Sequence, residues 1–215
     1  MKYALVLLAF CGFNTFAESL TVEYGTFYSH LRKIDDEDLN QLEFAFGFKQ
    51  VGTSGLCQIN SATIHTQKVD IPLEVTADRR FTLPTEKALK LANAQVEIDL
   101  VQPANQCDMS VQIQIKPELI KQTMTIAELS AFLHQFDIFF DDMGSFLSFL
   151  MPSADGILLE FAQNDIDITL DNQPVSGLPM EKQQLILKRE WLDGKQGEIA
   201  FSPVPEKITV FVSQD

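Results

Sequence analysis

Large apolar residues recur at every second position in two stretches of the chain. In QLEFAFGFKQV they are Leu42, Phe44, Phe46 and Phe48, and in MSVQIQIK they are Val111, Ile113 and Ile115. A period of two residues is typical of a β-strand that buries one face. Both stretches are therefore predicted to be half-buried strands.

Further strands are predicted at SLTVEYGTF, VEIDLVQ, GILLEFA, DIDITLD, QQLILKREWL, GEIAF and KITVFV. LCQIN and SATIHTQKVDIPLEV together predict one or two more strands. We expect QQLILKREWL and GEIAF to form a hairpin across the turn from Asp193 to Gly197. Pro72 cannot donate a ladder hydrogen bond, so it favours an edge strand or a strand end.

One long amphipathic helix is predicted over about residues 126–150. Thr125 can cap its first turn, and Glu128 can reach back to the cap, which is the arrangement of a capping box. Met124 can pack on Leu129 as a hydrophobic staple. Pro152 stops the helical pattern.

The remaining helical signals are short. A helical turn is predicted at YSHLRKI, and a short helix after Pro84 with Thr85 as its cap. Strands on both sides of one long helix, with no internal repeat and no linker-like tract, predict an α+β fold with a mainly antiparallel sheet. We expect the long helix to pack on that sheet and residues 18–215 to form a single domain.

The long helix carries an unusual apolar stripe. At 100° per residue, one face collects Phe132, Phe136, Phe139, Phe140, Met143 and Phe146. The simplest interpretation is a core helix lying on the sheet. The alternative is a cavity beneath the helix that holds a small hydrophobic ligand. Ile138 and Phe149 fall outside the stripe and are either covered or form a small exposed patch.

The same helix is not predicted to span a membrane. Asp137, Asp141 and Asp142 would each cost roughly 2.5–3.5 kcal/mol at the centre of a bilayer.

The N-terminus has the layout of a cleaved secretory signal peptide over residues 1–17. Lys2 precedes an apolar run, and small residues at Thr15 and Ala17 suit a cut before Glu18. The run is about half the length that a bilayer-spanning helix needs. A lipoprotein acylated at Cys11 is disfavoured because the bulky Phe10 precedes the cysteine. The expected location is therefore the periplasm.

Two cysteines remain after cleavage, Cys57 and Cys107. An even number of cysteines in an exported chain indicates a disulfide, here with only one possible pairing. A loop of this length stabilises the fold by roughly 4 kcal/mol in the chain-entropy description. Two separate buried thiols are the alternative.

Charge excludes two classes of partner. The net charge of −14 opposes binding to nucleic acid and to anionic lipid surfaces. It permits cationic partners, although solubility alone also explains it.

Candidate metal sites are weak. On the polar face of the long helix, His134, Asp137 and Asp141 could supply only part of a site. The carboxylates of Asp165, Asp167 and Asp171, with Asn164, lack the loop spacing that calcium needs. The run from Asp35 to Asp38 is most simply an exposed acidic loop. No metal is therefore expected.

Catalytic motifs are also scarce. Gly52-Thr53-Ser54-Gly55 is not a nucleophile elbow, and neither a phosphate loop nor a dinucleotide pattern is present, so no cofactor is expected. The three histidines, His30, His65 and His134, have no evident serine or acid partner. Trp191 could stack on a sugar, but packing is the simpler role for it.

Three patches, YSHLRKI, RRFTLPTEKALKLANA and SPVPEKITVFV, lie behind the signal peptide. With it, they resemble an uncharacterised family of small exported gammaproteobacterial proteins, a domain of unknown function. The resemblance implies a periplasmic setting and carries no catalytic or binding residue.

The function expected from these observations is that of a non-catalytic envelope accessory or protein-interaction module. A carrier or sensor of a hydrophobic molecule, held under the phenylalanine stripe, is the first alternative. A hydrolase is the second. The partner is an unknown protein or a small hydrophobic ligand.

Overall fold

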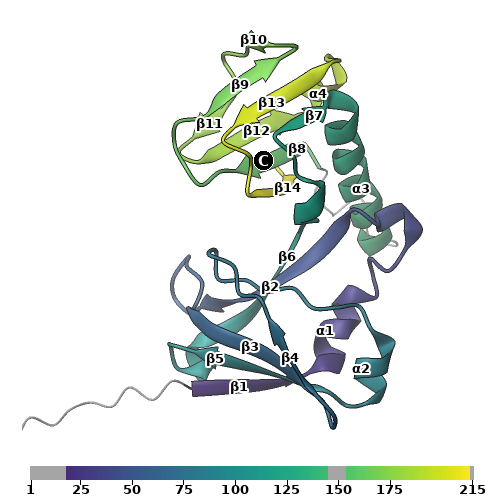
Figure 1. Ribbon diagram of the computed structural model, residues 1–215, viewed down its shortest axis with the longest axis vertical. Coiled ribbons are helices and arrows are strands. Elements are labelled where there is room, and N and C mark those ends of the chain that lie inside the picture. Colours follow the sequence, from purple (N-terminus) through teal and green to yellow (C-terminus); the bar gives the residue numbers. More distant parts are fainter. Residues whose placement is uncertain (1–17, 145–153, 214–215) are drawn as a thin grey trace, which may run out of the picture.

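A computed structural model describes residues 18–144 and 154–213. Several predictions fall outside these residues. They concern the signal peptide, Cys11, Phe146, Phe149 and the predicted end of the long helix near residue 150. The described part is α+β with mainly antiparallel pairing, as predicted. Figure 1 shows two groups of strands joined by a long diagonal strand pair.

The first group is a four-stranded antiparallel sheet in the order β1-β5-β3-β4. Its strands are β1 (Glu18–Glu23), β5 (Gln95–Leu100), β3 (Ile59–His65) and β4 (Asp70–Leu73). Pro72 lies in the edge strand β4, as predicted. Figure 1 shows α1 (Tyr24–Leu31) and α2 (Lys87–Leu91) beside this sheet.

Two boundaries in this group differ from the predictions. The first strand ends at Glu23 because the chain turns into α1 at Tyr24, whose side chain is fully buried. Thr85 does not cap α2, which has Glu86 at its N-cap without a side-chain hydrogen bond.

The second group contains two sheets. The larger has the order β11-β12-β8-β14-β6-β2, with β11 (Met180–Glu181), β12 (Gln184–Lys188), β8 (Gly156–Glu160), β14 (Lys207–Phe211), β6 (Cys107–Ile115) and β2 (Leu42–Gln50). The smaller has the order β10-β9-β13-β7, with β10 (Gln173–Pro174), β9 (Asp167–Leu170), β13 (Glu198–Ser202) and β7 (Thr123–Thr125).

The remaining helices of the second group are α3 (Ile126–Gly144), α4 (Arg189–Asp193) and the short 3-10 helices η1 (Glu37–Leu39) and η3 (Pro117–Leu119). The 3-10 helix η2 (Ala104–Gln106) contacts β1 of the first group instead. The described helices include none with the length and apolar composition required to cross a bilayer.

The predicted hairpin between QQLILKREWL and GEIAF is wrong. The strand β12 ends at Lys188, and the following residues form α4, so Trp191 lies on a helix. The strand β12 pairs with β8 and β11, whereas β13 pairs with β9 and β7 in the other sheet. The helical turn redirects the chain, which prevents the two strands from pairing with each other.

The start of α3 matches its prediction. The Thr125 amide donates to Glu128 Oε2 at 2.7 Å, and the Glu128 amide donates to Thr125 Oγ1 at 3.1 Å. These two bonds are the reciprocal pair of a capping box. Met124 and Leu129, the predicted staple, are both buried.

The pair β2–β6 joins the two groups. All nine residues of β2 are in register with β6, from Leu42 opposite Ile115 to Gln50 opposite Cys107. The predicted inward face of β2, from Leu42 to Phe48, is buried. The opposite face is also covered near Gly47, where a Cβ would lie 3.0 Å from the Arg79 carbonyl, so the strand is buried on both faces there.

A disulfide ties the first group of strands to this pair. Cys57 and Cys107 are bonded, with their Cα atoms 6.2 Å apart. The Cys57 amide also donates to the Phe48 carbonyl on β2 at 2.7 Å. The bond therefore holds the segment before β3 against one end of the β2–β6 pair.

An ion-pair cluster supplies a second link. Lys207 on β14 contacts Asp78 at 2.8 Å and Glu160 on β8 at 3.1 Å, and its side chain is 13% exposed. Burial alone would raise the pKa of Asp78, but hydrogen bonds from Lys207 and Thr76 outweigh it, so the pKa is lowered. The turn that carries Asp78 is thus held against the larger sheet.

We predict that replacing both cysteines, Cys57→Ala with Cys107→Ala, lowers the free energy of unfolding by about 4 kcal/mol, because the closed loop of the unfolded chain is released. Urea unfolding measures the loss. Free-thiol titration of the unreduced, unfolded wild type should find no reactive thiol at these positions, and a loss below about 1 kcal/mol would contradict the bracing role.

A second prediction concerns the approach of β8 to β12. A Cβ on Gly156 would lie 2.4 Å from the Leu187 carbonyl oxygen, which is backbone and cannot move aside. Gly156→Ala should therefore destabilise the protein by about 3 kcal/mol, as for an overpacked core. Gly25→Ala is the matched control, because the nearest atom is 3.9 Å away and the site is helical. That control should be neutral or stabilising, and equal losses for both variants would contradict the explanation.

Candidate functional site

The phenylalanine stripe of α3 packs into the core in its described part. Phe132, Phe136 and Phe139 are 3%, 0% and 7% exposed, and the Phe139 ring meets Phe44 of β2 edge-on at 5.8 Å. Phe140 is partly buried, and Met143 is 42% exposed. None of these side chains lines either of the two cavities described below.

The three histidines lie apart from one another in different elements. His30 on α1 contacts the rings of Phe44 and Phe46, and its pKa is lowered by burial and then by Lys33. His65 on β3 lies 2.8 Å from Asp70 and 3.3 Å from Glu97. His134 is exposed on α3. The structure does not bring them together as a catalytic group.

The metal candidates are also not assembled. Asp137 accepts a hydrogen bond from Arg189 Nη2 at 2.7 Å, an ion pair that joins α3 to α4. Asp167 lies on β9, whereas Asp165 precedes the strand. Across residues 18–144 and 154–213, no group of three or more His, Cys, Asp or Glu side chains could hold a metal ion.

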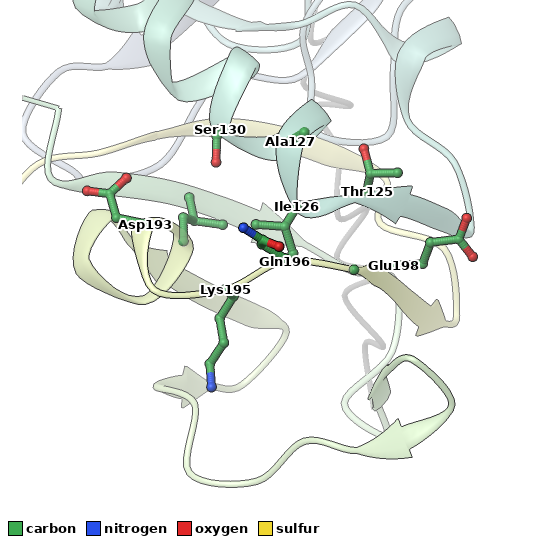
Figure 2. Close-up of a pocket in the computed structure, with 10 residues that line it drawn as sticks. Thr125, Ile126, Ala127, Ser130, Asp193, Lys195, Gln196 and Glu198 are labelled. Atoms are coloured by element: carbon green, nitrogen blue, oxygen red, sulfur yellow. The ribbon is translucent and has the colours of Figure 1, made fainter.

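One cavity, of about 400 Å³, lies between the start of α3 and the loop from α4 to β13. Figure 2 shows Ile126 and Gln196 side by side in the middle of the lining residues and Ser130 above them, while Lys195 and Glu198 extend away. Donors at the helix start are already used, because the Ile126 amide donates to the Gly197 carbonyl at 3.0 Å and the capping box occupies Thr125 and Glu128. The donors at the helix start are therefore not free to bind a ligand. The charged side chains of the lining also do not converge on one point.

A second cavity, of about 370 Å³, lies beside the start of β2, and we call it the β2-edge cavity. Its lining comes from four segments and comprises Leu31, Ile34, Asp35, Leu42, Glu43, Phe44, Thr82, Leu83, Pro84, Thr85 and Lys116. Its volume is at the lower end of the range for small-ligand pockets.

Backbone pairing positions two walls of the β2-edge cavity. The amides and carbonyls of Phe46 and Phe81 bond to each other at 2.8 and 2.9 Å, which brings the segment after Phe81 alongside β2. Tyr24 then anchors that segment, because its hydroxyl donates to the Pro84 carbonyl and accepts from the Glu86 amide. The wall formed by Thr82 to Thr85 is therefore fixed at both ends.

Glu43 is the notable group in the β2-edge cavity. Its Oε1 accepts a hydrogen bond from Gln114 at 2.8 Å, and Gln114 is 8% exposed. Within the described residues, no cation lies within 4 Å of its carboxylate. Burial raises the pKa of Glu43, the Gln114 hydrogen bond partly offsets this, and Glu118 and Lys116 have smaller opposing effects.

Sequence reasoning overlooked Glu43. It occupies a polar position of an alternating strand, which predicts exposure to solvent. Its burial depends on the register that places it opposite Gln114, 71 positions further along the chain. The only available signal was a carboxylate in the middle of an otherwise strongly apolar strand.

The comparisons with known proteins identify a family. The family described as "Protein of unknown function (DUF2987)" matches residues 16–161. The chain belongs to this family. Membership in DUF2987 agrees with the resemblance to an uncharacterised family, and the matched range contains the β2-edge cavity. Neither a curated protein nor a solved structure matches the chain.

We predict that Glu43→Gln stabilises the protein at neutral pH. The folded-state pKa of Glu43 lies above its unfolded value, so this carboxyl favours folding below the unfolded pKa and loses that contribution as pH rises through the folded pKa. The variant keeps an acceptor for Gln114 and removes the charge. Its advantage over wild type should shrink on acidification towards pH 4.

Urea unfolding at a series of pH values measures this difference. Glu118→Gln is the control, because it removes a nearby exposed charge and should change stability by less than about 0.5 kcal/mol. A Glu43 variant that is less stable than wild type at neutral pH would show that the carboxylate supports the fold.

Proposed function

We propose that this DUF2987 protein is a non-catalytic binding protein of the cell envelope, and that it recognises another protein through the β2-edge cavity. The observation that carries the proposal is Glu43, a half-buried carboxylate with a single hydrogen bond at the wall of a cavity. Other buried charges in the described part, such as Lys207, have partners. A group of this kind in a cleft is a candidate for binding.

The setting in the envelope is supported by two observations. The first seventeen residues have the pattern of a cleaved export signal. The Cys57–Cys107 disulfide suits an oxidising compartment such as the periplasm.

The two alternatives from the sequence have less support. A hydrophobic carrier would need space under the phenylalanine stripe, where Phe132, Phe136 and Phe139 are buried against other side chains. A hydrolase would need convergent polar groups near a histidine, and no histidine lines either cavity.

Site-specific photo-crosslinking in an exporting host tests the proposal. A photoreactive phenylalanine replaces Thr82, which is exposed at the β2-edge cavity, and in a separate variant replaces Gln196, which lines the other cavity. We expect a discrete covalent adduct with one protein from position 82 and none from position 196. An adduct from position 196 alone, or from neither position, would contradict the proposed surface.

A further inference from the structure

We propose that the β2-edge cavity receives the side chain of a lysine or arginine from the partner protein, with Glu43 as its counter-ion. This inference rests on the proposed function and specifies the chemistry that the cavity recognises. The shared chemistry is a cationic head on an aliphatic stem.

The free oxygen of Glu43 supplies the first argument. Gln114 donates to Oε1, and no donor of the described residues is bonded to Oε2. A carboxylate binds an ammonium or guanidinium group more strongly than a neutral donor, and a half-buried site strengthens that bond further. A cationic head would therefore satisfy the acceptor that the fold leaves open.

The shape of the lining supplies the second argument. Ile34 and Pro84 are the partly exposed apolar residues of the lining, whereas Leu42, Phe44 and Leu83 are buried behind it. Exposed polar residues of the lining are Asp35, Thr82 and Thr85. Lysine and arginine combine an apolar stem with a charged tip, so they match a lining with a few apolar contacts beside a carboxylate.

Charge supplies the third argument. The chain carries −14 overall, and two of the three charged groups in the lining are carboxylates. A field of that sign raises the local concentration of cations and speeds their association. Lys116 is the opposing charge in the lining, and it is near enough to affect Glu43 without forming an ion pair within 4 Å.

The test uses three probes with the mature protein: acetyl-Gly-Lys-Gly-amide, the same tripeptide with norleucine in place of lysine, and n-butylammonium chloride. Norleucine keeps the stem and removes the ammonium group. Binding is followed by NMR through the amide signals of Glu43, Thr82 and Lys116. We expect the lysine tripeptide to bind about tenfold more tightly than the norleucine tripeptide, as for one charge-assisted hydrogen bond.

Variants make the test specific to the cavity. Glu43→Gln should abolish the preference for lysine, and Lys116→Gln should strengthen binding of the lysine tripeptide. Glu118→Gln is the matched control, because it removes a nearby carboxylate that does not line the cavity, and it should preserve the preference. Unfolding curves of each variant verify that the fold is intact.

Each remaining outcome is decisive. Equal binding of the lysine and norleucine tripeptides would overturn the cationic assignment, while the crosslink from position 82 would still support protein binding there. Binding of n-butylammonium at least about tenfold tighter than that of the lysine tripeptide would contradict a protein source and assign the cavity to free alkylamines. Loss of the crosslink with retention of lysine selectivity would overturn the proposed function instead.

Discussion

The antiparallel pairing of β2 with β6 is the constraint on which the rest of the molecule depends. It extends the six-stranded sheet at one end and carries the first group of strands at the other. Because its two strands are far apart in sequence, the chain between them must close a large loop, and that loop includes β3, β4, α2 and β5. The disulfide and the hydrogen bonds between Phe46 and Phe81 hold this loop against the pair. The Phe46–Phe81 hydrogen bonds also position one wall of the β2-edge cavity.

Charged groups serve two different purposes in this structure. Asp78, Lys207 and Glu160 neutralise one another where the turn meets the larger sheet, and the lowered pKa of Asp78 reflects that stabilisation. Asp137 and Arg189 similarly connect two helices. Glu43 differs, because burial raises its pKa and its one bonded neighbour is an amide. A half-buried charge that the fold does not neutralise destabilises the free protein. A binding partner of opposite charge would offset that loss of stability, so such a charge can be retained at a binding site.

Membership in DUF2987 gives the chain relatives without giving it an activity. A function for this protein therefore has to come from the chemistry of its site and not from its fold. The residues that sequence motifs first suggested, the histidines and the acidic clusters, have local partners or lie apart from one another. The lining of the β2-edge cavity comes from four segments of the chain, which no local motif can describe.

Local patterns in the sequence determined the features that depend on neighbouring residues. The alternation in β2 and β6 and the capping box at Thr125 follow from spacing, and both are present. The disulfide followed from the number of cysteines left after the predicted signal peptide, and it is present too. Tertiary structure decided what depends on residues far apart in the chain. The helix α4 breaks the expected hairpin, Arg79 and Arg80 cover the second face of β2 near Gly47, and the β2–β6 register buries Glu43 beside Gln114. Local spacing cannot report these contacts, because each one depends on a pairing register or a packing surface that only the folded chain creates.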